Sequence, residues 1–414
     1  MRKLFSRDFT LVVIGQIISL FGNAVVRFAL PLYLLNRTGS SALYGTVTAC
    51  SLIPAILLSP VGGIVADRIN KRNIMVALDF FTAAVVAAFS LLLGEGVESV
   101  PLITATLMLL YGIAGAYQPS VQASVPALVG KEQFMAANSV INTISSFASL
   151  LGPVLGGILY SNYGLEPVLW VCTVCFLLSA VMEIFIHIPF AAREYGGSIL
   201  RTARDDLAES IRFIRRDKPI IGRAVLLVSG INLFLSSVIN VGLPYLVTEV
   251  LPFDVGQADR LYGYAAGILA AGGLAGGIFA GVFAKRLPLQ KSGRLLIAPA
   301  VCLFPVAAAF AFFSSGMVNY MVITVCCFAI MFFSTIFTVQ MMAFFQTVTP
   351  PQLTGKVIAV VVTVSMCAQP LGNALYGVLF EICAGYEFAV LLFAGAVSLT
   401  IAVYADRLLA DISC

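Results

Sequence analysis

The sequence has few charged residues, one histidine and one tryptophan. Of its 414 residues 11% are charged and 60% are hydrophobic, whereas a soluble domain has about 25% charged residues. So few charges cannot cover the surface of a soluble fold of this length, which excludes soluble, disordered and coiled-coil proteins. The net charge of +4 excludes a nucleic-acid-binding protein. The composition instead predicts a polytopic membrane protein.

The shortage of chemically reactive patterns narrows the function further. A single histidine, His187, leaves no histidine-based triad and no zinc motif of the H-E-x-x-H type. The nine cysteines lie almost entirely in apolar runs, where they act as small hydrophobic residues. No G-x-x-x-x-G-K-[ST] motif occurs, so the chain itself does not hydrolyse ATP. We therefore expect no enzyme, no catalytic residues, no cofactor and no metal.

Long apolar segments are what the sequence has in their place, and a segment of about 20 residues can cross the hydrocarbon core as a helix. Twelve such segments lie near residues 9–35, 43–66, 73–93, 101–129, 135–161, 167–189, 220–249, 260–284, 294–315, 318–347, 355–382 and 386–406. The sequence thus predicts an all-α membrane protein with twelve transmembrane helices.

The basic residues give the orientation. With the N-terminus inside, 21 of the 24 Lys and Arg residues fall at the cytoplasmic side, in agreement with the positive-inside rule. Both termini are then cytoplasmic. Residues 190–219 join the sixth and seventh spans, and their apolar positions recur at helical spacing. This pattern predicts an amphipathic helix at the interface, within a segment that otherwise serves as a linker.

The two halves of the chain share an internal repeat. Residues 43–45 read Leu-Tyr-Gly, as do residues 261–263, and residues 63–68 resemble residues 281–286 at the same spacing. Parallel repeats of six spans, with substrate held between the halves, are a known transporter layout. We therefore expect an N-terminal six-helix bundle over 1–189 and a C-terminal one over 220–414, joined by the linker 190–219.

Two motifs carry a family resemblance. Residues 63–72 read Gly-Ile-Val-Ala-Asp-Arg-Ile-Asn-Lys-Arg, which resembles the G-x-x-x-D-R-x-x-R-[RK] signature of the major facilitator superfamily. Residues 152–157 are similar to the G-P-x-x-G-G motif that is associated with exporters in that superfamily. The gating residues implied by the resemblance are Gly63, Asp67, Arg68, Arg72, Asp79, Gly152, Pro153 and Gly156.

Further residues resemble one bacterial branch, the macrolide-efflux and enterobactin-exporter proteins. They include Gly15-Gln16, Ser19-Leu-Phe-Gly22, Ala29-Leu-Pro31, Asp79 and Phe213-Ile-Arg-Arg216. The resemblance implies a multi-pass protein of the bacterial inner membrane that works by alternating access. One departure is that drug–proton antiporters of the superfamily carry an arginine in the fourth span, where this chain has no basic residue.

A polar stripe in the first span marks the candidate central site. Gln16, Ser19, Asn23 and Arg27 share one helical face, and Asn232 and Asn240 belong to a matching stripe in the seventh span. Such stripes indicate either a polar cavity or hydrogen bonding between helices, and we favour the cavity. The candidate substrate-binding residues are Gln16, Asn23, Arg27, Tyr111, Gln118, Gln122, Asn232, Asn240, Gln340 and Phe345.

Ionisable residues inside the spans are candidates for proton coupling, because charge within a membrane is costly and functional by default. They are Arg27, Asp79, Glu183 and Glu381. We expect an anionic partner for Arg27 and a pairing of Asp79 with Arg68, Arg72 or another charge at the inner gate. Glu183 and His187 are four residues apart and form either a proton relay or an interfacial pair without function. Glu381 is expected to reach towards water.

The sequence therefore predicts a secondary transporter, functional as a monomer in a lipid bilayer. The best specific interpretation is efflux of a small amphiphilic, drug-like solute or siderophore, driven by protons. Polarizable methionine and phenylalanine side chains beside a few amides suit such a solute. Two alternatives stay open: a lipid or lysolipid transporter of the same fold, and a membrane ligand sensor that transports nothing.

Overall fold

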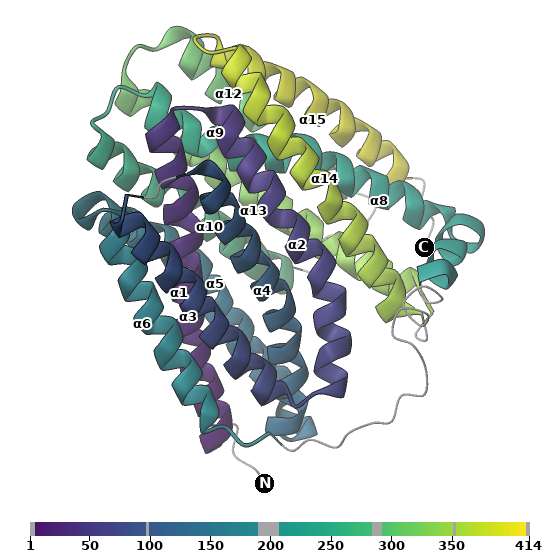
Figure 1. Ribbon diagram of the computed structural model, residues 1–414. Coiled ribbons are helices and arrows are strands. Elements are labelled where there is room, and N and C mark those ends of the chain that lie inside the picture. Colours follow the sequence, from purple (N-terminus) through teal and green to yellow (C-terminus); the bar gives the residue numbers. More distant parts are fainter. Residues whose placement is uncertain (1–4, 97–98, 189–206, 284–291, 351–352, 411–414) are drawn as a thin grey trace. The chain divides into compact units, whose positions relative to one another are not determined.

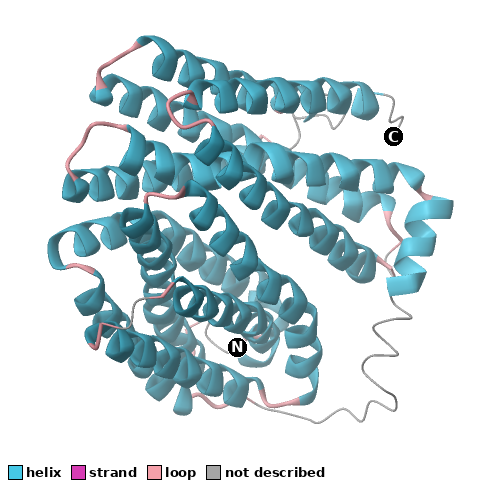
Figure 2. Cartoon of the chain, turned by 45° about the horizontal axis from the view of Figure 1, so that its top comes forward, coloured by secondary structure: helices cyan, strands magenta, loops and turns pink. Residues whose placement is uncertain are grey.

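A computed structural model describes residues 5–96, 99–188, 207–283, 292–350 and 353–410. Figure 1 shows the course of the chain, and Figure 2 shows that the described part contains helices and loops but no strand. Twelve helical segments of the described residues are long and apolar enough to cross a membrane. The predicted all-α membrane fold is confirmed.

The first six spans are continuous α-helices. They are α1 (Arg7–Thr38), α2 (Ser41–Arg68), α3 (Lys71–Gly94), α4 (Val100–Leu128), α5 (Phe134–Tyr163) and α6 (Leu165–Ile184). Local sequence explains several of their ends. Ser99 begins α4 by accepting a hydrogen bond from the backbone NH of Leu102 at 3.4 Å, as an N-cap residue does. Gly164 alone separates α5 from α6, with a φ of +76° that favours glycine.

Of the next six spans, the seventh and the ninth are interrupted. The seventh runs from Pro219 to Val250 and is composed of α8 (Pro219–Ile231), η3 (Asn232–Ser236), α9 (Ser237–Tyr245) and η4 (Leu246–Val250). The remaining spans are α10 (Val255–Val282), α11 and α12 (Ser292–Leu295 and Ile297–Phe312), α13 (Gly316–Val348), α14 (Thr354–Ile382) and α15 (Glu387–Ala410). Both η3 and η4 are π-helical, a geometry that is rare and often found at functional sites.

The chain forms two compact units, each with its own apolar core. The first contains most of the N-terminal half together with Val255–Gly267, and the second contains most of the C-terminal half together with Thr38–Ala49. The start of α2 therefore belongs to the second unit, and the start of α10 belongs to the first. Phe9, Met75 and Ile141 lie in the core of the first unit.

Glycine pairs mark where these exchanged helix starts cross their neighbours. In the second unit, a Cβ added at Gly45 would lie 2.8 Å from the Cα of Gly377, so α2 and α14 touch backbone to backbone. In the first unit, a Cβ added at Gly157 would lie 3.1 Å from the Cα of Gly263, on α5 and α10. Small residues permit such close approach of membrane helices. Gly45 and Gly263 are the glycines of the repeated Leu-Tyr-Gly sequence.

The end of the linker packs on the second unit. Residues 207–212 are helical and lead into η2 (Phe213–Asp217). Phe213 is buried in the core of this unit, and the Lys356 ammonium lies 2.7 Å from the Glu209 carboxylate. The predicted amphipathic helix lies partly among residues 190–206, which are outside the described residues, and its placement at the membrane interface stays a prediction.

Candidate functional site

A polar cavity of about 80 Å³ lies within the first unit, between α1, α3 and α4. Its lining residues are Leu20, Asn23, Arg27, Asp79, Thr82, Ile113, Ala114, Tyr117 and Gln118. Asn23, Arg27 and Gln118 were predicted as substrate-binding residues. The structure brings them together in the lining of one cavity, which also contains the carboxyl group of Asp79. The mixture of charged, amide and aliphatic groups suits a ligand with both polar and apolar parts.

Arg27 is held by an aromatic ring and a carbonyl. Its guanidinium lies 4.1 Å from the centre of the Tyr111 ring and donates a hydrogen bond to the carbonyl of Leu110 at 3.1 Å. A cation over an aromatic face is stabilised by the ring quadrupole, more so when water is excluded. The expected anionic partner is not among the described contacts of Arg27, whose buried Nε also lacks a hydrogen-bond acceptor there. Within the described protein, Tyr111 and Leu110 hold the guanidinium, and a substrate anion as its partner stays a prediction.

Asp79 faces α1 rather than the basic end of its own helix. Its Oδ1 accepts a hydrogen bond from the hydroxyl of Ser19 at 3.0 Å, and the side chain is buried. The expected pairing with Arg72 is wrong, because Arg72 lies two turns earlier on α3 and Asp79 turns to Ser19 instead. Arg68, the other expected partner, has a side chain outside the described residues.

Glu183 belongs to a buried chain of three side chains. The Gln16 amide donates to the Tyr117 hydroxyl at 2.6 Å, and that hydroxyl donates to Glu183 Oε1 at 2.7 Å. Gln16 and Glu183 are both fully buried. The expected pair with His187 is wrong, because α6 ends at Ile184 and His187 lies beyond it, where its backbone NH donates to Asp8.

Tyr117 was missed by the sequence analysis. It lies on α4 directly before the predicted residue Gln118, and its hydroxyl joins an amide to a carboxyl. A buried tyrosine hydroxyl usually finds a hydrogen-bond partner, so a tyrosine in a span beside other polar residues was the available signal. The partner itself, 66 positions away along the chain, could not be read from the sequence.

The second polar stripe forms hydrogen bonds between helices. The Asn232 amide donates to the backbone carbonyl of Ser365 at 2.8 Å, and Ser236 donates to the Asn232 side chain at 3.4 Å. Ser237 donates to the carbonyl of Gln369. These contacts match the alternative interpretation of polar residues as links between helices. Asn240 is exposed.

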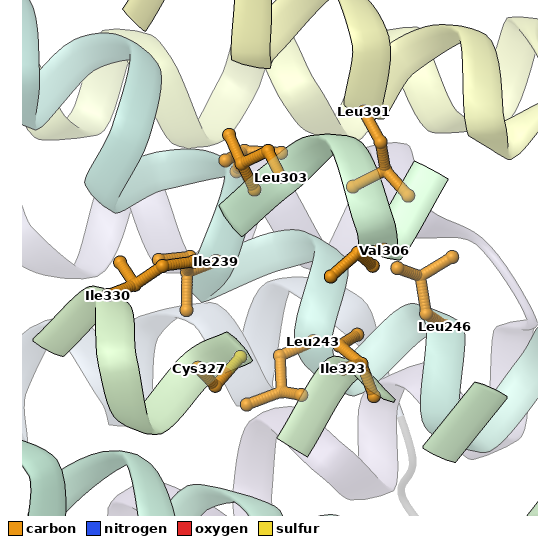
Figure 3. Close-up of a pocket in the computed structure, with 10 residues that line it drawn as sticks. Ile239, Leu243, Leu246, Leu303, Val306, Ile323, Cys327, Ile330 and Leu391 are labelled. Atoms are coloured by element: carbon orange, nitrogen blue, oxygen red, sulfur yellow. The ribbon is translucent and has the colours of Figure 1, made fainter. Parts of the chain in front are cut away.

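Other predicted substrate-binding residues lie in different surroundings. Phe345 is buried in the apolar core of the second unit beside Met341, Gln122 on α4 is exposed, and Gln340 on α13 is half-buried. A second cavity, drawn in Figure 3, lies in this unit and is only about 20 Å³ in volume. Its lining is apolar, with residues such as Leu243, Leu303 and Ile330 pointing into it.

The predicted gating residues are partly described. The side chains of Asp67 and Arg68 and the surroundings of Gly63 lie outside the described part of the chain, although α2 continues as a helix to Arg68. Gly152 and Gly156 bring α5 against α1, since a Cβ at Gly156 would lie 2.9 Å from the Phe28 ring and one at Gly152 would overlap Ala24. Pro153 lies inside α5 between these two glycines.

Glu381 caps a helix in the second unit. It lies near the end of α14 and is exposed. It accepts hydrogen bonds from the hydroxyl of Ser40 at 2.9 Å and the backbone NH of Ala42 at 3.1 Å. A carboxylate there satisfies free NH groups at the start of α2 and complements the helix dipole. This contact gives Glu381 a structural role at the α2–α14 crossing.

Comparisons with known proteins agree with this architecture. The sequence model of the Major Facilitator Superfamily matches residues 12–373. The chain is 23% identical over 374 residues to macrolide efflux protein A of Streptococcus pyogenes, covering 87% of this chain and 86% of that protein. It is 24% identical over 380 residues to the multidrug efflux pump Tap of Mycobacterium tuberculosis, covering 90% and 86%.

Solved structures show the same fold. The nucleoside transporter NupG superposes with a TM-score of 0.77 over 97% of this chain and 99% of that one, at 13% identity. A bacterial homologue of the iron transporter ferroportin, in an inward-facing state, superposes with a TM-score of 0.70 over 96% and 98%, at 19% identity.

Proposed function

Because the chain belongs to the major facilitator superfamily, we propose that it exports a small amphiphilic, drug-like solute or siderophore from bacteria in exchange for protons. Two six-helix bundles, 1–189 and 220–414, would expose the site alternately to the two sides of the inner membrane, with both chain termini in the cytoplasm. The two relatives named above are efflux proteins, and this chain aligns with 86% of the length of each. That similarity supports export rather than uptake.

The polar cavity of the first unit is the observation that carries this proposal. A buried guanidinium and a buried carboxyl, Arg27 and Asp79, line one space together with Leu20 and Ile113. Charge inside a membrane is retained where it serves a substrate or ion pathway. The apolar part of the lining favours a solute with hydrocarbon or ring surface, and the amides of Asn23 and Gln118 can orient its polar groups.

The glycine crossings support alternating access. The predicted topology puts the α2 and α10 starts on the outer side, where Gly45 meets Gly377 and Gly157 meets Gly263. Contacts between bare backbones can separate without breaking side-chain interactions, so these crossings suit the outer closure of such a cycle. The inner closure would involve Asp67 and Arg68, as the superfamily motif implies.

A growth-inhibition screen followed by vesicle transport tests the proposal. A bacterial strain expressing the protein should tolerate higher concentrations of at least one amphiphilic compound. Everted membrane vesicles should then accumulate that compound, and collapse of the pH gradient should stop the accumulation. Asp67→Asn should lose this transport at normal expression, whereas the matched change Asp254→Asn, at an exposed acid, should retain it.

The same experiment separates the alternatives. Movement of fluorescent lysolipid in proteoliposomes, without movement of any drug-like compound, would identify a lipid transporter. Binding of a compound to the purified protein, with no transport under any gradient, would identify a sensor. Either result would contradict the proposed export.

A further inference from the structure

Three buried oxygen atoms in the first unit accept no hydrogen bond. They are Oε1 of Gln16, Oδ2 of Asp79 and Oε2 of Glu183, and each has no donor among the described residues. All three belong to the polar cluster formed by Gln16, Ser19, Asp79, Tyr117 and Glu183, called here the acid cluster. A buried acceptor without a donor is costly, so the cluster is short of hydrogen atoms when both acids are ionised.

No described lysine, arginine or histidine forms an ion pair with either acid of the cluster. Arg27 of α1 lines the same cavity as Asp79, but its guanidinium contacts the Leu110 carbonyl and the Tyr111 ring. Tyr117 on α4 is also titratable; it bonds to Glu183 and lines the cavity together with Asp79. At the far end, Asp8 of α1 and the backbone of His187 bond to each other. Two carboxylates buried together without a paired cation are strongly unfavourable.

Protonation of the two acids removes both the unpaired buried charge and the shortage of hydrogen-bond donors. A proton on each acid cancels the buried negative charge and converts two free acceptors into donors, one of which can serve the free oxygen of Gln16 after rotation. We propose that Asp79 and Glu183 are the proton-binding pair of this transporter and that Tyr117 passes protons from the cavity to Glu183. The inference rests on the proposed proton-driven export, whose coupling residues it names.

The geometry assigns different positions to the two acids. Asp79 lines the cavity and can take a proton there directly. Glu183 does not line the cavity and touches it through Tyr117, whose hydroxyl donates to Glu183 Oε1. Tyr117 also belongs to the apolar core cluster that contains Phe9, Ile186 and Ile188. Access to Glu183 therefore runs by way of the Tyr117 hydroxyl.

The transfer step conserves atoms and charge. A hydronium ion in the cavity gives a proton to Tyr117 Oη while Tyr117 gives its own proton to Glu183 Oε1. Water is left in the cavity, the tyrosine is neutral before and after, and Glu183 becomes a neutral acid. The cavity has charged and amide groups in its lining and, at about 80 Å³, is large enough for water molecules. Release follows the same path in reverse.

Infrared spectroscopy of the purified, full-length protein tests proton binding without any substrate. A pH titration should show the carbonyl band of protonated carboxylic acids in the wild type. Glu183→Gln and Asp79→Asn should each remove part of that band, and Tyr117→Phe should shift the Glu183 part because one hydrogen bond is lost. Glu95→Gln, the same change at an exposed acid of the N-terminal half, should leave the band unchanged.

Transport in proteoliposomes then separates coupling from folding. One proton exchanged across one pH unit supports about a tenfold solute gradient, and Glu183→Gln should reduce that gradient to none. The same variant should still exchange labelled for unlabelled solute at equal pH, which shows that it is folded and binds. Tyr117→Phe should slow gradient-driven transport more than exchange, and Asp79→Glu should restore part of the activity that Asp79→Asn loses.

Two results would overturn the inference: an identical titrating band in wild type and Glu183→Gln, or full gradient-driven accumulation by Glu183→Gln. If Glu183→Gln does not fold, the same two measurements on Asp79→Asn and Tyr117→Phe decide. Failure of the proposed export looks different, since the wild type would then accumulate no compound under any gradient while its carboxyl band still titrated.

Discussion

The two repeated halves of the chain have used one polar stripe in different ways. In the first span, Gln16 is connected to Glu183 through the Tyr117 hydroxyl, and Ser19 bonds to Asp79. In the seventh span, Asn232 and its serine neighbours bond to backbone carbonyls of α14 and to one another. The first stripe therefore lies among ionisable groups, whereas the second links helices with neutral amides and hydroxyls.

Buried charge and cavities follow the same division. The acidic side chains that are buried in the described part of the chain, Asp79, Glu183 and Asp259, all belong to the first unit. The polar cavity lies there too, while the described cavity of the second unit is small and apolar. The described helices of the second unit therefore pack without a buried acid. We infer that ion chemistry is concentrated in the first unit.

The contrast between the two units predicts its largest effect at Arg27 and no effect at Asn240, the matching position of the second stripe. Arg27→Gln should leave the protein folded but reduce transport at least about tenfold, since a buried cation in the cavity is lost. Asn240→Gln should transport normally, because Asn240 is an exposed neutral residue. Initial rates in everted vesicles, normalised to expression, measure both.

A conservative change at the same position sharpens this prediction. Arg27→Lys should be partly active, because an ammonium keeps the charge but loses the planar group that covers the Tyr111 ring. Equal transport rates for wild type and Arg27→Gln, with the same pH dependence, would instead mean that Arg27 has no role in transport. Its contacts with Tyr111 and Leu110 would then only offset the cost of burying its charge.

The sequence predicted the fold more fully than it predicted the site. Segments of about 20 apolar residues identify spans on their own, because a helix in a membrane must satisfy its backbone internally. The residues Arg27, Asp79 and Glu183 also stood out, since charge is rare within spans. Fold class and the key ionisable residues are therefore local signals.

The partners of those residues are not local signals. Asp79 bonds to Ser19, 60 positions away, and Glu183 bonds to Tyr117. The expected pair of Glu183 and His187 assumed one helix through both, but α6 ends at Ile184. Partner choice depends on which helix faces meet, and a single sequence does not contain that information. The exchange of helix starts between the units was unpredicted for the same reason.

The glycine crossings predict an effect that both halves share. A valine at Gly45 or at Gly157 would place side-chain atoms against the backbone of the facing helix. Overpacking of this kind costs about 1–3 kcal/mol, so both variants should unfold at lower denaturant concentration and transport more slowly. Gly281→Val is the matched control, because a Cβ there meets nothing within 4 Å.

Unequal effects of the two glycine variants would break the symmetry that the repeat suggests. If Gly45→Val destabilised the protein and Gly157→Val did not, the α5–α10 crossing would have room that its backbone distances exclude. Unfolding in detergent, followed by circular dichroism, provides the comparison.

A smaller effect is expected when one member of each polar stripe is removed. Asn232→Ala should lower the free energy of unfolding by about 0.6 kcal/mol, an average value for a hydrogen bond between membrane helices, and should leave proton coupling unchanged. Ser19→Ala should instead alter the pH dependence of transport, because Asp79 then loses its hydroxyl donor. Unfolding and pH–rate profiles on both variants test the comparison, and an altered pH profile in Asn232→Ala would contradict it.

The smallest effect is expected at the exposed ion pair between Glu209 and Lys356 in the second unit. Both side chains are partly open to solvent, with 53% and 36% of their surface exposed, so water and salt screen the attraction. Exposed pairs contribute about 0.2–1 kcal/mol. A double-mutant cycle of Glu209→Gln and Lys356→Gln should give a coupling energy in that range that falls as salt is added, with transport unchanged. Phe213, buried in the core of the second unit, is expected to hold the linker end in place. A coupling energy well above this range would mean that charge supports the second unit as well, and the contrast between the two units would then lie in burial rather than in charge.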